Sequence, residues 1–235
     1  RIELYGPVAL GRAPGDEIRP PQKVAEQVGE RKRRNGVRPI LAVALVAVGQ
    51  LAAQAASSQT TWIDSPVSGG TAGAEQGTLV IFAGGDAQAI DSLSLIYNVL
   101  SQRVTRMGAT GAGQATKICN QLIVAANSAL IAEAVALAGK AGVDTRLLAP
   151  ALAGGFADSK PFQILAPRMA AHSFEPVQWK VQTLSKDLNN AVQLAAEFAL
   201  QIPVAQQALR QLQAHQASGF AEKDLATVIQ HVEAQ

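Results

Sequence analysis

The chain has one cysteine, few aromatic residues and few charged residues among its 235 positions. Cys119 has no second cysteine to pair with, so no disulfide forms within the chain, which agrees with a reducing, cytoplasmic location. The net charge of +2 is too small to indicate nucleic-acid binding, and residues 31–34 hold much of the basic excess. This composition is typical of a well-buried globular protein in which alanine fills much of the interior.

The histidines and acidic residues form no recognisable catalytic or metal-binding group. His172, His215 and His231 are far apart and lack the spacing of metal ligands or of a catalytic triad. We expect all three to be surface or capping residues, and we expect no metal site. Cys119 is expected in the core and not as a nucleophile.

Complete glycine-rich phosphate-binding turns are also absent from the sequence. A Gly-x-Gly-x-x-Gly turn needs a third glycine, and Gly111-Ala-Gly113 is followed by Thr116 at that position. The glycines near the N-terminus have the wrong spacing. A Walker loop is absent as well, because no glycine directly precedes Lys117.

Residues 1–49 are expected to form an atypical, poorly ordered segment. Prolines interrupt it, and residues 22–34 allow only a short charged helix without an apolar face. Residues 40–48 are continuously apolar, which favours a buried strand or helix. The basic run before them resembles a targeting signal, but a membrane span needs about 20 apolar residues. We therefore expect no membrane association. A truncated or frame-shifted start would explain the composition of residues 1–45.

The pattern over residues 50–112 is that of the rear part of an α/β domain. We expect a helix over 51–57, and strands over 61–63, 78–82 and 103–107. Asp86 is expected to cap a helix that runs to Leu100. The Ser68-Gly69-Gly70 stretch predicts a turn whose N–H groups can hold a carboxylate.

The pattern over residues 113–235 is helical throughout, so the chain is expected to be mostly α. A helix over 114–140 would be about 40 Å long and would end at Gly142. Its small-residue stripe predicts close helix packing, and an apolar seam runs beside it; the stripe is Ala125, Ala129, Ala132 and Ala136, and the seam is Ile123, Leu130 and Leu137. Further helices are expected over 175–200, over 203–219 and from 223 onward, with Ser159 capping a shorter helix that has Pro161 in its first turn.

A glycine-rich turn leads into the long helix, and polar residues follow it. Lys117, Asn120 and Gln121 are three and four residues apart, which places them on one helix face. The glycines from Gly108 to Gly113 permit positive φ angles and close backbone approach. Taken alone, a lysine at this position is most simply a solvated surface charge.

Three stretches together give this lysine a more specific interpretation. Residues 64–79, 108–121 and 185–188 resemble, in order and spacing, the motifs of the β-hydroxyacid dehydrogenase family, which contains 3-hydroxyisobutyrate dehydrogenase-like and 2-hydroxy-3-oxopropionate reductase-like enzymes. The resemblance covers about residues 50–235. It implies an α/β remnant of a Rossmann-type domain followed by an all-α C-terminal domain, over 113–235, that forms the interface of a homodimer or homotetramer.

The resemblance also implies a role for each matching residue. Lys117 would be the catalytic acid/base in hydride transfer between NAD or NADP and a small β-hydroxy acid. The implied substrate-binding residues are Ser68, Gly69, Gly70, Asn120 and Gln121. Lys186 would contact the cofactor, although a surface lysine beside Asp187 is the alternative.

One position departs from the family pattern. Gln121 stands where the family carries asparagine, so its amide lies on a longer side chain. It reaches the substrate differently, or the substrate preference has shifted, or activity is lost.

Two functions from different classes follow from these observations. The first is an NAD(P)-dependent β-hydroxyacid dehydrogenase, favoured by Ser68, Lys117 and Lys186. The second is a non-catalytic helical dimerisation module or a truncated product without the cofactor domain, favoured by the missing glycine turn.

Overall fold

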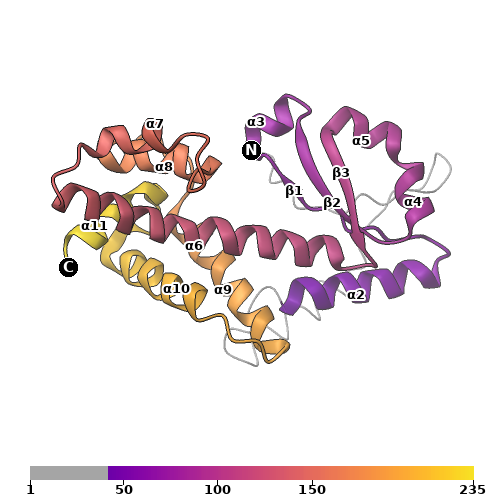
Figure 1. The fold of residues 1–235 in the computed structure, drawn as a ribbon. Helices are drawn as coiled ribbons and strands as arrows, with labels where there is room; N and C mark the ends of the chain where they lie inside the picture. Colours follow the sequence, from indigo (N-terminus) through magenta and orange to yellow (C-terminus); the bar gives the residue numbers. More distant parts are fainter. Residues whose placement is uncertain (1–41) are drawn as a thin grey trace. The chain divides into compact units, whose positions relative to one another are not determined.

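The computed structural model describes residues 42–235, and the expectations for residues 1–41 lie outside this range. The chain divides into two compact units with the boundary between Lys117 and Ile118. The first described element is helix α2, Ala42–Ser57, which contains the helix expected over 51–57. From Ala42 onward the apolar run is therefore helical and not a strand (Figure 1).

The first unit contains a three-stranded mixed sheet with strand order β1-β2-β3 (Figure 1). Its strands are β1, Val67–Ser68; β2, Leu79–Gly84; and β3, Ser101–Gly108. β1 pairs antiparallel with β2, and β2 pairs parallel with β3, with Ile81 opposite Val104. The strands expected over 78–82 and 103–107 are confirmed. β2 alternates buried and half-buried side chains, because one face of the strand covers the small core of this unit.

The strand expected over 61–63 is wrong. Residues 61–63 have no ladder partner among the described residues, and Asp64 forms an isolated bridge with Gly84. Pro66 follows and has no N–H to donate, so regular pairing with β2 is limited to the two residues of β1.

Short helices connect the strands: α3, Gly70–Glu75; α4, Ala87–Ser92; and α5, Ser94–Leu100. Asp86 caps α4 as expected, because its carboxylate accepts the Ala89 N–H at 2.9 Å. The single helix expected from Asp86 to Leu100 is broken at Leu93. The Ser92 hydroxyl donates to the Ala89 carbonyl, and the Leu93 N–H bonds Ile90 instead of Ala89.

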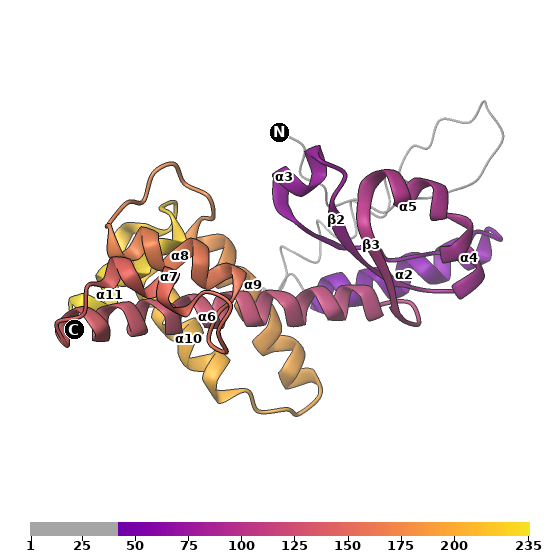
Figure 2. The same cartoon turned by 45° about the horizontal axis from the view of Figure 1, so that its top comes forward.

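The second unit is entirely helical, and its first helix, α6, Ala112–Lys140, begins in the first unit (Figures 1 and 2). The α-helices that follow are α7, Leu148–Leu152; α8, Lys160–Ala170; α9, Val181–Glu197; α10, Pro203–His215; and α11, Val228–Glu233. Short 3-10 turns precede α7 and α11, at Thr145–Leu147 and Leu225–Thr227, and a π-helical turn, Gln216–Phe220, follows α10. The fold class expected from the sequence is confirmed: a Rossmann-like α/β part precedes a helical C-terminal part.

The core of the second unit is built on the alanine stripe of α6. Ala125, Ala129 and Ala132 are buried in one cluster with Leu188 and Leu212, from α9 and α10. Small side chains let the neighbouring helices approach closely, as the sequence predicted. The apolar seam beside the stripe is different: Ile123, Leu130 and Leu137 are 58%, 60% and 72% exposed.

Among the described residues, α6 is the one helix that is long and apolar enough to cross a membrane, by length and composition alone. Its buried alanine stripe accounts for part of that apolar composition, since core helices of soluble proteins pass the same test.

Several local signals in this unit are confirmed, and several helix ends differ. Gly142 has a φ of +80°, and Ser159 caps α8 by accepting the Phe162 N–H. α9 begins at Val181 instead of residue 175, because Lys180 is held in an isolated bridge with Asp224. α10 ends at His215, and the π-helical turn after it contains Gly219 with a φ of +95°.

Candidate active site

A buried carboxylate fixes the start of the helix that carries Lys117. Asp64 is 4% exposed, and its two oxygens accept the N–H groups of Gly111 and Gln114 at 2.7 and 2.8 Å. N–H groups in the first turn of a helix have no partner within the helix, and the helix dipole favours a negative charge there. Asp64 therefore acts as an N-terminal cap supplied from a distant part of the chain.

The glycine-rich turn before α6 allows this carboxylate to come close. A Cβ atom added at Gly113 would lie 2.7 Å from Oδ2 of Asp64 and 2.8 Å from its carbonyl oxygen. Gly111 has a φ of +95°, in the left-handed region that favours glycine. The glycines thus allow Asp64 to lie close to the backbone at the start of α6.

The predicted substrate turn leads from β1 into α3. Ser68 is the last residue of β1, and Gly69 and Gly70 have φ angles of +135° and +63°. A Cβ atom at Gly69 would lie 3.1 Å from the Leu79 side chain, so both backbone conformation and space favour glycine there. Ser68, Gly69, Gly70 and Lys117 all belong to the first unit.

The helix face around Lys117 corrects one expectation. Lys117 is half-buried, and its neighbour Ile118 is 7% exposed. Cys119 is exposed, so its predicted place in the core is wrong. Consecutive helical residues point about 100° apart, and Ile118 takes the inward-facing position instead.

In the second unit, two of the predicted site residues contact one carboxylate, and a third bonds one of these two. Gln121 Nε2 donates to Asp187 Oδ2 at 2.6 Å, and Asn120 Nδ2 donates to Gln121 Oε1 at 2.9 Å. The Lys186 ammonium forms an ion pair with Asp187 Oδ1 at 3.1 Å. Asp187 is 9% exposed, so the carboxylate is largely out of water, and its bonds to Gln121 and Lys186 are charge-assisted.

In the sequence, Asp187 stood out only as the neighbour of Lys186. Its place in the Ser185-Lys186-Asp187-Leu188 stretch was the available signal. Its bond to Gln121 spans 66 positions and joins α6 to α9, and helix periodicity does not predict such a contact.

Lys186 also lines a polar hollow on the surface of the second unit. The hollow has a volume of about 360 Å³ and is bordered by Gln182, Thr183, Lys186 and Gln216. The Lys186 side chain is 47% exposed, so its ammonium can bind both Asp187 and a ligand from solvent.

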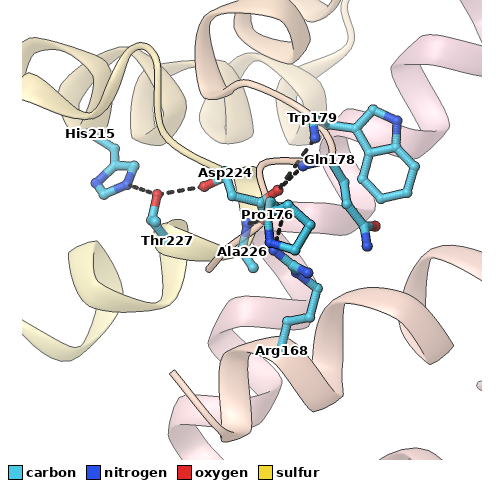
Figure 3. Close-up of polar contacts among 8 residues, drawn as sticks. All are labelled: Arg168, Pro176, Gln178, Trp179, His215, Asp224, Ala226 and Thr227. Carbon is cyan, nitrogen blue, oxygen red and sulfur yellow. Dashed lines mark hydrogen bonds and ion pairs between the residues drawn. The ribbon is translucent and has the colours of Figure 1, made fainter. Parts of the chain in front are cut away.

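A buried polar cluster anchors the segment that precedes α9 (Figure 3). Asp224 is 1% exposed, and its Oδ2 accepts the Gln178 N–H at 2.7 Å. Its Oδ1 accepts the Ala226 N–H at 3.0 Å and faces Arg168 Nη2 at 3.4 Å. These contacts hold the chain beside the first turn of α9, the helix that carries Lys186 and Asp187.

His215 belongs to the same cluster, so its expected place at the surface or at a helix cap is wrong. It is 1% exposed, stacks on Phe220 at 4.2 Å and bonds Thr227 Oγ1 at 2.8 Å. Burial, together with His231 nearby, lowers the pKa of His215 to about 4. His215 is the last residue of α10, one helical turn beyond Leu212, and both side chains face the interior.

The hydrogen bonds in this cluster determine which ring nitrogen of His215 carries the proton. The Thr227 hydroxyl donates to the Asp224 carbonyl at 2.7 Å, so its oxygen accepts from His215. His215 is therefore neutral with hydrogen on Nε2. Among residues 42–235, no group of three or more His, Cys, Asp or Glu residues is arranged to hold a metal ion.

Two family models match successive parts of the chain. The NAD-binding domain of 6-phosphogluconate dehydrogenase matches residues 43–108. The NAD-binding domain of NADP-dependent 3-hydroxyisobutyrate dehydrogenase matches residues 111–232, which is more than half of the chain.

Curated relatives and solved structures agree with these models. A 2-hydroxy-3-oxopropionate reductase from Escherichia coli is 36% identical over 73% of this chain and 59% of its own length. The 3-hydroxyisobutyrate dehydrogenase from Salmonella typhimurium has a TM-score of 0.72 and 26% identity over 79% of this chain and 65% of its own. The Mycobacterium tuberculosis 3-hydroxyisobutyrate dehydrogenase structure with L-serine has a TM-score of 0.71 and 27% identity over 80% and 66%.

The chain thus spans less than two thirds of the length of these relatives. The two model matches together cover the α/β part and the helical part, and the second contains Lys117, the Asn120–Gln121 pair and Lys186. The chain belongs to the β-hydroxyacid dehydrogenase family, whose 3-hydroxyisobutyrate dehydrogenase-like members it resembles in both parts.

Proposed function

We propose that the chain acts in an NAD(P)-dependent oxidoreductase of the 3-hydroxyisobutyrate dehydrogenase type, which interconverts a small β-hydroxy acid and the corresponding carbonyl compound. The observation that carries this proposal is the network in which Asp187 joins Gln121, Asn120 and Lys186. Family membership supports it, since the motifs that carry these residues lie in the matched region.

Each residue has a role that its chemistry allows. Lys117 exchanges a proton with the hydroxyl oxygen, because an amine and its ammonium form can act as base and acid. The Ser68-Gly69-Gly70 turn and the amides of Asn120 and Gln121 bind the carboxylate and hydroxyl groups of the substrate.

Lys186 would hold the cofactor from the edge of the polar hollow that it lines. The nicotinamide ring supplies or accepts the hydride when it is bound. Titration with NADH and NADPH distinguishes NAD from NADP, and a panel of hydroxy acids identifies the substrate.

We further propose that the chain assembles as a homodimer or homotetramer through the exposed seam of α6. Ile123, Leu130 and Leu137 recur every seven residues on one helix, and each is more than half exposed. A second copy that packs its own seam against this one would remove all three side chains from water. Leu130→Glu is expected to lower the mass measured by light scattering, whereas an unchanged mass would refute this interface.

A cytoplasmic location agrees with the single cysteine.

The alternative is a non-catalytic helical module. It is favoured by the absence of a Gly-x-Gly-x-x-Gly turn from the sequence, because that turn normally holds the cofactor pyrophosphate.

Cofactor binding and turnover separate these two functions. The purified chain is titrated with NADH and NADPH while nicotinamide fluorescence is followed, and is then assayed with a panel of short β-hydroxy acids that includes L-serine. Saturable binding together with turnover is expected. Saturable binding without turnover, or no binding to a folded sample, would refute the dehydrogenase.

The role of Lys117 is tested by Lys117→Ala, with Lys140→Ala as the control at the exposed end of the same helix. Loss of general acid/base catalysis is expected to reduce kcat by about 10²- to 10⁴-fold in the first variant only. Equal activity of the two variants would refute the proposed role.

A further inference from the structure

The carboxylate of Asp187 has two different partners, one on each oxygen. Oδ2 accepts the side-chain amide of Gln121 at 2.6 Å, and Oδ1 faces the Lys186 ammonium at 3.1 Å. Gln121 lies on α6, whereas Asp187 and Lys186 are neighbours on α9. A single buried residue thus touches one residue expected to bind substrate and one expected to bind cofactor.

The chemistry of a carboxylate determines how Gln121 is oriented. An ionised carboxylate accepts hydrogen bonds and donates none, so the Gln121 group that faces it must be the NH₂. The Gln121 oxygen then points to Asn120, which must donate its own NH₂ at 2.9 Å. Asp187 therefore orients the Gln121 amide directly and, through Gln121, the Asn120 amide.

This orientation decides which atoms remain to bind a ligand. Asn120 keeps its carbonyl oxygen as an acceptor and one N–H as a donor, and Gln121 keeps one N–H. Lys186 keeps donors beyond the one directed at Asp187. A hydroxy acid needs an acceptor for its hydroxyl proton and donors for its oxygens, and this set of atoms supplies both.

The length of the glutamine side chain is part of the arrangement. Asparagine at the same position would draw the amide back by about one C–C bond, or ~1.5 Å. A bond of 2.6 Å to Asp187 would then be stretched beyond the hydrogen-bonding range.

We propose that Asp187 is a positioning residue: it fixes the donor and acceptor pattern that Asn120 and Gln121 present to a small hydroxy acid, and it holds Lys186 beside them. The substrate part of this inference rests on the proposed function. The orientation of the two amides does not, and it can be measured without turnover.

The first test observes the Gln121 side-chain amide by NMR in glutamine-labelled protein, with the signal assigned by its loss in Gln121→Ala. Asp187→Asn is expected to shift both Gln121 amide protons, because the charged acceptor is lost. Gln121→Asn, observed in asparagine-labelled protein, provides a second variant that leaves Asp187 in place. It is expected to show an amide with the shifts of a solvent-exposed side chain.

The matched control is the exposed pair in which Gln211 donates to Glu133 at 2.7 Å. Glu133→Gln is expected to leave the Gln121 signal unchanged. A Gln121 signal that does not respond to Asp187→Asn would overturn the proposal, whether or not the chain turns over substrate.

The second test is a double-mutant cycle on steady-state kinetics. Asp187→Asn is expected to raise the KM for the hydroxy acid by about tenfold or more, with a smaller change in kcat, because binding groups are misoriented. In a Gln121→Ala background the same substitution is expected to change that KM less than about twofold, because Asp187 acts on substrate through Gln121. Independent, multiplicative effects of the two substitutions would overturn the proposal. Inactivity of the wild-type chain would instead refute the proposed function, and the NMR test would then decide the positioning role alone.

Discussion

The buried neutral histidine at position 215 predicts how the stability of the protein depends on pH. The pKa of His215 is lowered to about 4 from the ordinary value of 6.5 by burial and by the neighbouring His231. As pH falls below 6.5, the unfolded chain takes up a proton on this histidine that the folded chain does not accept. The stabilisation is complete above pH 6.5 and is lost progressively as pH falls toward 4.

The magnitude follows from the separation of the two pKa values. A difference of 2.5 between 6.5 and about 4, at about 1.36 kcal/mol per unit, corresponds to about 3 kcal/mol. At pH 5 about 2 kcal/mol of this would already be lost, since the unfolded histidine is then almost fully protonated. The side chain is 1% exposed, so solvent screens the effect little.

The assay is urea unfolding at a series of pH values, followed by the fluorescence of Trp179, whose backbone N–H bonds Asp224. A Trp62→Phe background leaves Trp179 as the single tryptophan. His215→Gln keeps an N–H to donate to Thr227 but does not titrate, so its free energy of unfolding is expected to fall less steeply with acid. Between pH 7 and pH 5 the free energy of unfolding of the wild type should fall by about 2 kcal/mol more than that of His215→Gln.

The control is His172→Asn. His172 is half-exposed and has a φ of +48°, a conformation that asparagine tolerates. This variant is expected to follow the wild-type slope in acid more closely than His215→Gln does. Parallel curves for wild type and His215→Gln between pH 7 and pH 5 would refute the burial of a neutral His215.

Three further substitutions test polar contacts within one unit or the other. Asp64→Asn is expected to lower the free energy of unfolding by about 2–4 kcal/mol in urea titrations, because its NH₂ would face one of the two N–H groups now bonded to the carboxylate; a change below about 0.5 kcal/mol would contradict the capping role. Asp224→Asn removes the charge that faces Arg168, so the free energy of unfolding is expected to fall by about 3–5 kcal/mol in the same titration. A stability equal to wild type would show that the ion pair contributes nothing. Ser159→Ala is expected to cost only about 1 kcal/mol, and a loss as large as that of Asp224→Asn would exclude a simple cap.

Local signals in the sequence were sufficient for much of the fold. Short runs of strand-forming residues predicted β2 and most of β3, and 3.6-residue periodicity predicted α6 and its buried alanine stripe. The caps at Asp86 and Ser159 were also predicted, because a cap bonds an N–H only three residues away. In each case the residues that determine the structure lie within a few positions of one another.

Helical periodicity was less reliable at predicting which face of α6 is buried, because it does not identify the elements that pack against the helix. Ile123, Leu130 and Leu137 lie on one side of α6, as their spacing requires, but they are exposed in the described chain. Cys119 is exposed and Ile118 buried, which depends on where the neighbouring helices pack and not on α6 itself. Sequence predicts that a helix has faces, whereas the tertiary fold decides which face is covered.

The candidate site shows the same division. That Lys117, Asn120 and Gln121 share a helix face follows from their spacing. That Gln121 and Lys186 meet the same carboxylate does not, because the contact joins residues 66 positions apart on two helices. The resemblance to a family identified the residues, and the fold supplied Asp187, which connects them.

Two of the buried carboxylates, Asp64 and Asp224, make polar, long-range contacts that the sequence did not predict. Asp64 accepts N–H groups 47 and 50 positions away, and Asp224 accepts one 46 positions away. Each holds backbone that cannot complete its own hydrogen bonds: the first turn of α6 in one unit and the segment before α9 in the other. A carboxylate suits this role because its two oxygens accept several bonds and donate none. Asp64 and Asp224 therefore anchor α6 and α9, the two helices that bear Lys117, Gln121 and Lys186. Removing either carboxylate should disturb the site even though every site residue is unchanged.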